Sequence, residues 1–334
     1  MMRITAWVLS AAVWIAASTA SVAASEKKET FGCESNPTGD PIGGGPGYRD
    51  VRTSGHFTVK TADQLLAALK EAKAGQVIFL PDGAEIDLTG HKNLAIPAGV
   101  ILAGTRGLKG SAGARIFTTL KTTSPLLRTA GDKVRLTGLR FEGPLPGRER
   151  VPYFSGFLRT THYGLEIDNC EIYNWNCYAV RAGGGATKVR VHHCFIHHCQ
   201  LSGYGYGISL GGCDVYIIAN KFDWCRHHIA SSGAPGSSYE AAYNLVLPNA
   251  SSHYFDMHGG RDRGDSTDIA GDWMEVHHNT FRGGHPAVAI RGVPSQGANI
   301  HHNWFAKPAD QSVRSSGNTR VWRNVYGPEK ILED

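Results

Sequence analysis

The chain has 334 residues, of which 41 are glycine, 15 are proline and only 19% are charged. So few charges exclude an acidic disordered polymer, while 41% hydrophobic residues are enough for a sizeable core. The formal net charge of +5 is small and evenly spread, which argues against a nucleic-acid partner. It is compatible with an acidic polymer as ligand if the cations collect on one face.

Residues 1–24 have the features of a cleavable signal peptide. Arg3 supplies a positive start, and the apolar stretch Ala6–Ala17 is followed by small residues. This stretch is short for a membrane span, and no later segment is long and apolar enough to cross a bilayer. We therefore expect a secreted or periplasmic monomer without a membrane partner, with a leader segment at residues 25–56 and one domain at residues 57–334.

The strongest signal is an internal repeat of strand–turn–strand units that turn at Asn or Cys. The turning positions form one column with steps of 24, 26, 24, 35, 24 and 21 residues: Cys170, Cys194, Asn220, Asn244, Asn279, Asn303 and Asn324. Apolar and polar residues alternate around each turn, and a second short strand ending in glycine lies between units. This pattern predicts an all-β solenoid of stacked parallel strands. We interpret the Asn column as scaffold, because Asn tolerates left-handed turns and its amide can bond the next coil.

Residues 61–73 predict a helix that caps the first coil. Thr61 and Gln64 have the spacing of a capping box, and Leu65 and Leu69 belong to an apolar stripe at helical spacing. A cap is expected because the open end of a solenoid exposes unpaired strand edges.

Three segments carry a family resemblance: LLAALKEAKAGQVIFLPDG at residues 65–83, IPAGVILAG at residues 96–104 and LEIDNC at residues 165–170. They resemble right-handed parallel β-helix proteins of the pectate-lyase-like superfamily. The resemblance implies a right-handed parallel β-helix with an N-terminal capping α-helix. It also implies that the glycine-ended strands build the sheet whose outer face forms the substrate groove. The superfamily includes lyases, hydrolases, epimerases, esterases and adhesins, and the Arg-x-Pro-x-x-Arg signature of its main pectate lyase family does not occur here.

Strand alternation places several chemically active side chains in one row. If Phe255 and Met257 point inward, Asp256 and His258 point outward. Because neighbouring coils lie about 4.8 Å apart, His258 becomes a direct neighbour of Arg291 on the next coil.

The one oversized step of the repeat, 35 residues between Asn244 and Asn279, adjoins this row. It contains a glycine-rich insertion at residues 259–272 with two arginines and four aspartates. Insertions on one face of a solenoid often build its binding site. We therefore expect the functional site near residues 228–291.

The chemistry that this row supports is β-elimination on a uronate polymer, which would make the protein a polysaccharide lyase. The C5 proton beside the sugar carboxylate becomes acidic only when the carboxylate charge is neutralised. We predict that Arg291 neutralises the carboxylate, His258 removes the proton and Tyr254 protonates the departing oxygen. The residues predicted to bind the acidic polysaccharide are Arg261, Arg263, His228, Asp256 and Arg181. Asp256 could also orient an imidazole or help to bind a cation.

Other functions remain open from the sequence alone. A glycoside hydrolase needs two carboxylates, which Asp256 with Asp262 or Asp265 could supply. A C5-epimerase would share the proton abstraction but leave the polymer length unchanged, and a non-catalytic β-helix would only bind glycan. Arg291 and Asp256 could also form a purely structural ion pair.

No residue is assigned as a metal ligand from the sequence. The aspartates of the insertion could hold Ca²⁺, although they do not match an EF-hand and a solvated loop balanced by arginines is favoured. Paired histidines recur at one repeat position, and the repeat explains them without a metal. Cys170 with Cys194, and Cys199 with Cys225, are spaced either for disulfides or for packing as reduced thiols.

Overall fold

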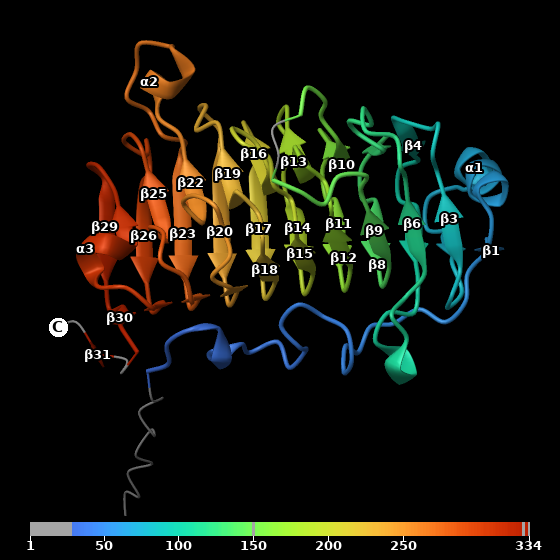
Figure 1. The fold of residues 1–334 in the computed structure, drawn as a ribbon, viewed down its shortest axis with the longest axis horizontal. Coiled ribbons are helices and arrows are strands. Elements are labelled where there is room, and N and C mark those ends of the chain that lie inside the picture. The colour runs from blue at the N-terminus through green and yellow to red at the C-terminus, as the bar shows by residue number, and fades with distance from the viewer. Residues whose placement is uncertain (1–28, 149–150, 329–330, 333–334) are drawn as a thin grey trace, which may run out of the picture.

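The computed structural model describes residues 29–148, 151–328 and 331–332. The chain winds into stacked coils whose strands form three sheets (Figure 1). Within the described residues every strand pair is parallel except the last, between β30 and β31. The predicted all-β parallel β-helix is therefore confirmed.

Each sheet takes one strand from successive coils. Sheet A contains β1 (Phe57–Thr58), β2 (Val77–Phe79), β5 (Ile101–Ala103), β8 (Arg135–Thr137), β11 (Glu166–Asp168), β14 (Val189–His192), β17 (Asp214–Ile218), β20 (Ser238–Ala242), β23 (Trp273–His277), β26 (Gly297–His301) and β29 (Thr319–Trp322). Sheet B contains β3 (Glu85–Asp87), β6 (Arg115–Phe117), β9 (Arg140–Glu142), β12 (Glu171–Tyr173), β15 (Phe195–His197), β18 (Lys221–Asp223), β21 (Leu245–Val246), β24 (Thr280–Phe281), β27 (Trp304–Phe305), β30 (Val325–Tyr326) and β31 (Ile331–Leu332). Sheet C contains β4 (Leu94–Ile96), β7 (Leu127–Thr129), β10 (Gly156–Thr160), β13 (Tyr178–Gly183), β16 (Tyr206–Gly211), β19 (His227–Ser231), β22 (Phe255–Met257), β25 (Val288–Ile290) and β28 (Val313–Arg314).

The core is continuous along the stack. Ile78, Leu102 and Leu136 are successive members of one inward column of sheet A, and all three are fully buried. In sheet B, Phe281 stacks on Phe305 with ring centroids 5.1 Å apart. Because each coil packs its apolar face against its neighbours, the core grows with every repeat.

The Asn column forms the predicted ladder between sheets A and B. The amide nitrogen of Asn244 donates to the side-chain oxygen of Asn279 over 2.9 Å, and Asn279 donates in turn to Asn303 over 2.9 Å. One part of the prediction is wrong, because the left-handed residue of each turn is the one before the ladder position. His278 (φ 52°) and His302 (φ 55°) are examples. The ladder residue therefore serves as a hydrogen-bonding partner rather than as the turn-former.

Both ends of the stack carry additional structure. The helix α1 (Ala62–Glu71) begins after Thr61, whose hydroxyl accepts from the Gln64 amide over 3.3 Å. The predicted capping box forms only in part, because the Gln64 side chain accepts from the amide of Lys60 over 2.7 Å. At the other end β31 adds to sheet B as an antiparallel strand beside β30, and the short α3 (Ala309–Ser312) precedes β28.

Residues 29–56 run lengthwise along the stack, from the last coils back to α1 (Figure 1). The amide of Gly32 donates to the carbonyl of His302, and the amide of Gly43 donates to the carbonyl of Ala219. This segment includes the short 3₁₀ helix Cys33–Ser35; a second 3₁₀ helix, Leu108–Gly110, lies within the solenoid. We refer to residues 29–56 as the lengthwise segment.

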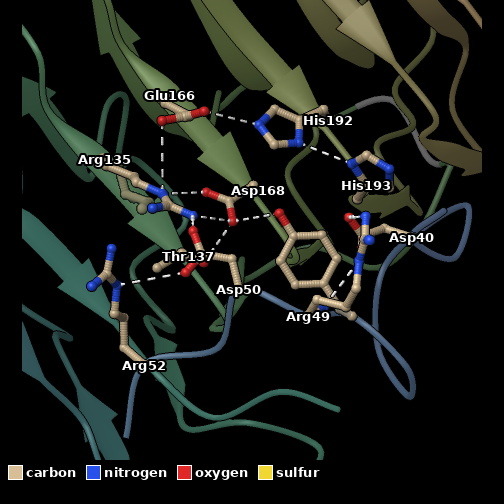
Figure 2. A network of polar contacts seen from close by, with 12 residues as sticks. Asp40, Arg49, Asp50, Arg52, Arg135, Thr137, Glu166, Asp168, His192 and His193 are labelled. Carbon is tan, nitrogen blue, oxygen red and sulfur yellow. Dashed lines mark hydrogen bonds and ion pairs between the residues drawn. The ribbon is translucent and has the colours of Figure 1, made fainter. Parts of the chain in front are cut away.

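The lengthwise segment is fixed to the solenoid by a buried network around Asp168 (Figure 2). The carboxylate of Asp168 is fully buried and accepts from Arg135 Nε over 2.7 Å and from the Tyr48 hydroxyl over 2.9 Å. Arg135 also pairs with Asp50 over 2.8 Å. Nearby, the Nε2 atom of His193 is bonded to the hydroxyl of Thr38 over 2.9 Å.

The predicted signal peptide, residues 1–24, lies outside the described residues. Among the residues that the structure describes, no helix has the length and apolar character needed to span a membrane. All seven cysteines lie in the described part and are free thiols, so Cys170 and Cys194 occupy the ladder as buried, packed side chains.

Candidate functional site

The outer face of sheet C carries the predicted row near the insertion that contains α2 (Gly260–Arg263). In the strand register Asp256 pairs with Ala289, and the flanking Phe255 and Met257 are fully buried. His258 follows β22 and is 30% exposed at its side chain, while Arg291 follows β25 and is 34% exposed. His258 and Arg291 therefore lie outward as predicted, whereas Asp256 and Ala289, also predicted outward, are each 1% exposed.

Asp256 is the centre of the site, although its side chain is only 1% exposed. One carboxylate oxygen, Oδ2, lies 2.9 Å from Arg291 Nη2, 3.1 Å from His258 Nε2 and 3.5 Å from His227 Nε2. The other, Oδ1, lies 3.5 Å from His253 Nδ1. We call these five residues the Asp256 cluster: Asp256, His227, His253, His258 and Arg291.

The charges of the cluster keep Asp256 ionised. Burial is the largest single influence and by itself raises the pKa of this carboxyl. The contacts of His253 and His258 and the charge of Arg291 outweigh burial, so the pKa of Asp256 falls well below its ordinary value. A buried carboxylate that stays ionised can hold a guanidinium and an imidazole in fixed positions.

Arg291 and His258 are the exposed members of the row. Arg291 also reaches the insertion, where Nη1 lies 3.2 Å from Asp262 Oδ1. Since the Nε2 edge of His258 faces Asp256, its Nδ1 edge points the other way, 4.0 Å from Asp262 Oδ2. Asp256 thus orients an imidazole, as the sequence suggested.

The backbone of His258 is held in place by close packing against the turn at Gly233 on the preceding coil. Gly233 follows β19 and has a φ of 64°, in the left-handed region. A Cβ atom at Gly233 would collide with the carbonyl oxygen of His258, so only glycine allows this approach.

Three predicted site residues are wrong because they are buried: Asp256, Tyr254 and His228. The 1% exposure of Asp256 rules out its predicted contact with the polysaccharide. Tyr254 is fully buried, its hydroxyl donates to the carbonyl of Pro248 over 3.3 Å, and burial raises the pKa of Tyr254 to about 12. His228 is also fully buried and stacks on Tyr254, with ring centroids 5.5 Å apart. Neither side chain can contact a polysaccharide, so Tyr254 is not the acid and His228 is not a substrate ligand.

The reason for the errors at His228 and Tyr254 is a break in strand alternation. His228 and Ile229 follow one another in the chain and are both fully buried, although the register keeps one constant offset through the pairs Tyr206–His227 and Ile208–Ile229. Tyr254 lies just before β22, where alternation does not yet apply. His228 therefore points inward together with Ile229, and His227 lies against the Asp256 carboxylate instead.

The arginines of the insertion differ from one another. Arg261 is 87% exposed at its side chain, with Asp268 at 4.0 Å, and it remains a candidate for binding acidic sugars. Arg263 is only 14% exposed, because it pairs with Asp265 over 2.7 Å and donates to the carbonyl of Ser232 over 3.0 Å. Arg263 therefore holds the insertion against β19, which contradicts its predicted role as a substrate ligand.

A row of arginines continues the outward column of Asp256 along sheet C. In register, Arg128 pairs with Arg159 and Arg159 with Arg181. The same column then passes through Ser209 and Ala230 to Asp256. Only Arg181 of this arginine row was predicted, because the early coils are too degenerate for the repeat to align them.

A groove lies along the arginine row and extends toward the coil that carries the Asp256 cluster. Its volume is about 520 Å³, and its lining includes Arg159, Arg181, Ser209 and Ser232. Ser232 is the counterpart of His258 on the preceding coil, since Ser231 pairs with Met257. The glycines that end β13 and β16 complete the wall, and the absence of side chains there leaves room for a ligand.

The paired histidines are structural, as predicted. His192, His277 and His301 each bond through Nε2 to a glutamate on the preceding coil and through Nδ1 to the next histidine. In the insertion, Asp262 and Asp265 are engaged by Arg291 and Arg263. Among the described residues, the group whose donor atoms converge as metal ligands would is His227, His253 and Asp256.

The fold and site define a parallel β-helix whose sheet C carries an arginine-lined groove and, near it, a histidine–arginine cluster. No protein-family model and no curated protein sequence matches the chain. The fold is similar to that of an alginate lyase from Paenibacillus sp. str. FPU-7, with 16% identity, a TM-score of 0.48, and coverage of 81% of this chain and 95% of that one. It also has some similarity to the PL6 family alginate lyase AlyGC, with 13% identity, a TM-score of 0.24, and coverage of 82% and 52% respectively. At these identities the likeness concerns the fold alone.

Proposed function

We propose that this protein is a polysaccharide lyase that cleaves a uronate-containing glycan by β-elimination. The observation that carries the proposal is the pair of partly exposed groups, His258 and Arg291, held by the buried carboxylate of Asp256 on the coil after the one that contributes Ser232 to an arginine-lined groove. Basic grooves attract polyanions, and a guanidinium pairs closely with a carboxylate.

The reaction assigns one task to each exposed group. Arg291 pairs with the sugar carboxylate and stabilises the negative charge that develops when C5 loses its proton. His258 accepts that proton at Nδ1, while its Nε2–H donates to Asp256, which stabilises the imidazolium formed. The electron pair of the C5–H bond becomes the C4–C5 double bond, and the C4–O bond to the leaving sugar breaks.

The leaving oxygen needs a proton from another source than Tyr254, which is buried. The imidazolium of His258 is the nearest candidate in the cluster, because it has just received a proton on the side of the substrate. In this scheme one histidine acts first as base and then as acid. Water is the alternative donor.

The arginine row supports a polymer rather than a single sugar as substrate. Coils lie about 4.8 Å apart, so Arg128, Arg159 and Arg181 present cations at regular intervals along sheet C. A uronate chain carries a carboxylate on each acidic sugar and could pair with several of these cations. Such a glycan would be met outside the cytoplasm, in agreement with the signal peptide expected at residues 1–24.

A glycoside hydrolase is supported less well. Hydrolysis requires a carboxylic acid whose pKa is raised so that it can donate a proton. The pKa of Asp256 is lowered by its cationic neighbours, and the pKa of Asp265 is lowered chiefly by hydrogen bonds from Thr267. Both carboxyls are therefore poor acids.

The test is incubation of the purified protein with alginate, polygalacturonate, glucuronan and glycosaminoglycans. A lyase shortens one of these polymers and produces the ultraviolet absorbance of a conjugated C4–C5 double bond, and His258→Gln abolishes both changes. Shortening without this absorbance would indicate a hydrolase, and a changed sugar configuration at constant length would indicate an epimerase. Binding without any chemical change would leave a glycan-binding protein, and each of these three outcomes would overturn the proposal.

A further inference from the structure

His227 presents an unused lone pair inside the Asp256 cluster. Its side chain is 1% exposed, and its Nδ1 atom lies 2.6 Å from the carbonyl oxygen of His253. A carbonyl oxygen can only accept a hydrogen bond, so Nδ1 carries the ring proton and Nε2 has the lone pair. That lone pair faces Asp256 Oδ2 at 3.5 Å, which places two acceptors opposite each other.

Two buried atoms of the cluster are left without partners. Neither His227 Nε2 nor Asp256 Oδ1 makes a hydrogen bond to any residue that the structure describes. An unpaired buried polar atom is costly, and such atoms are rare in folded proteins. A cation placed between them would satisfy both.

His253 adds a third donor. Its Nδ1 atom lies 3.5 Å from Asp256 Oδ1, and one donor atom from each of the three residues lies within 4.8 Å of the others. Donors bound to one tetrahedral ion at about 2.0–2.2 Å lie about 3.3–3.6 Å apart. A movement of about 1 Å by His253, which is 23% exposed, would therefore complete the geometry.

We infer that His227, His253 and Asp256 bind one divalent transition-metal ion, such as Zn²⁺, Mn²⁺ or Co²⁺. Two imidazoles and one carboxylate suit these ions, whereas Ca²⁺ prefers oxygen ligands throughout. The bond from His227 Nδ1 to a carbonyl is the outer contact that commonly orients a metal-binding histidine. This site is distinct from the Ca²⁺ site that the aspartates of the insertion could form. Metal binding here does not depend on the proposed reaction.

The groups beside Asp256 Oδ2 leave room for this ion. Arg291 and His258 both approach Oδ2 of Asp256, whereas Oδ1 is the unpaired oxygen. The alternative occupant is a proton shared by Asp256 and His227, which would leave the cluster indifferent to added metal. Metal titration separates these two cases.

The experiment uses full-length protein purified without a polyhistidine tag and treated with chelator. Zn²⁺, Mn²⁺, Co²⁺ and Ca²⁺ are added separately, and binding is measured by calorimetry and by the shift in thermal unfolding. The inference predicts one equivalent of a transition metal bound more tightly than Ca²⁺, with a raised unfolding temperature. In His253→Ala and Asp256→Asn the dissociation constant should rise about tenfold or more.

Two controls make the result specific. His285→Ala removes an exposed histidine on the next coil and should leave binding unchanged. Metal binding that survives in both the His253 and the Asp256 variant would assign the ion to the paired histidines and overturn the inference. Equal affinity for Ca²⁺, or no metal binding at all, would also overturn it. If Asp256→Asn does not fold, His253→Ala decides alone, because its partly exposed side chain is the ligand least needed for packing. Lyase activity is scored separately, so failure of either proposal leaves the other standing.

Discussion

Arg291 and Asp256 form an ion pair of 2.9 Å between neighbouring coils, and Arg291 extends the pair to Asp262 at 3.2 Å. Removing the guanidinium would leave the negative charge of the buried Asp256 carboxylate with fewer neighbouring groups to stabilise it. The same residue therefore contributes to stability and, in our proposal, to catalysis. The two contributions can be separated by the choice of substitution.

Arg291→Lys should fold nearly as well as the original protein but lose most of its activity. Lysine keeps the positive charge beside Asp256 but cannot pair with two oxygens in the plane of a carboxylate. We expect kcat to fall about 10²-fold while the free energy of unfolding changes by about 1 kcal/mol or less. Steady-state kinetics and denaturant unfolding measure the two effects. Arg190→Lys, on sheet A, is the matched control, and unchanged kcat in Arg291→Lys would contradict the assigned role.

His258→Gln should lose the chemical step and keep substrate binding. Glutamine preserves a donor toward Asp256 but supplies no base, and general bases contribute about 10²–10⁴-fold to rates. We expect kcat to fall by that factor with KM changed little. His91→Gln, at the other end of the stack, should behave like the original protein. A variant of His258 with full kcat would move the base to another residue.

Substitutions in the arginine row should weaken binding without slowing the chemistry. Arg159→Ala and Arg181→Ala each remove one charged contact to a polyanion, and each should raise KM about tenfold at low salt. Because salt screens such contacts, the difference should shrink as ionic strength rises. KM measured across a salt series tests this expectation. Equal KM in these variants and in Arg190→Ala would place the polymer elsewhere.

Acid should destabilise the contact between the lengthwise segment and the solenoid. Burial, with a smaller contribution from His192, lowers the pKa of His193 to about 4, from 6.5 in an unfolded chain. Between pH 6.5 and 4 the unfolded state therefore binds one more proton at this residue, and stability falls as pH falls. The slope from one such group is up to about 1.4 kcal/mol per pH unit.

His193→Asn is the variant that tests this slope. His193 has a φ of 50°, and asparagine tolerates the left-handed region without adding a titrating group. Denaturant unfolding at pH 7 and pH 5 should show a smaller loss of stability in the variant than in the original protein. His91→Asn should retain the original pH dependence. If His193→Asn lost as much stability between pH 7 and pH 5 as the original protein, the assignment of this pH dependence to His193 would be refuted.

Asn279→Ala should be strongly destabilising although it removes only a small polar side chain. Asn279 donates to Asn303 and to the carbonyl of Ala241, and it accepts from Asn244 over 2.9 Å. Each buried group left unpaired costs about 1–3 kcal/mol, so we expect a loss of about 2–5 kcal/mol in the free energy of unfolding. Asn299→Ala, on the exposed face of sheet A, should cost less than about 1 kcal/mol.

The sequence was sufficient for the architecture because every coil repeats the same hydrogen-bonding requirement. The Asn column and the alternating strands predicted the solenoid and the outward position of His258. Alternation failed at His228, where two consecutive residues point inward, and at Tyr254, which precedes its strand. His227 was missed because only a contact across coils brings it to Asp256. His253 was missed because it precedes β22, where strand alternation does not predict the direction of a side chain.

The lengthwise segment has a consequence for how the stack can change. Solenoids usually fray from their ends, since each repeat is held only by its neighbours. Here the lengthwise segment contacts His302 near the last coil and Arg135 nearer the first coils. Opening either end of the stack therefore disrupts contacts of a segment that is also bound at the other end. The molecule should consequently melt in one concerted step. The length of the lengthwise segment also limits the number of coils, because a coil could be inserted or deleted only if this segment became longer or shorter to match.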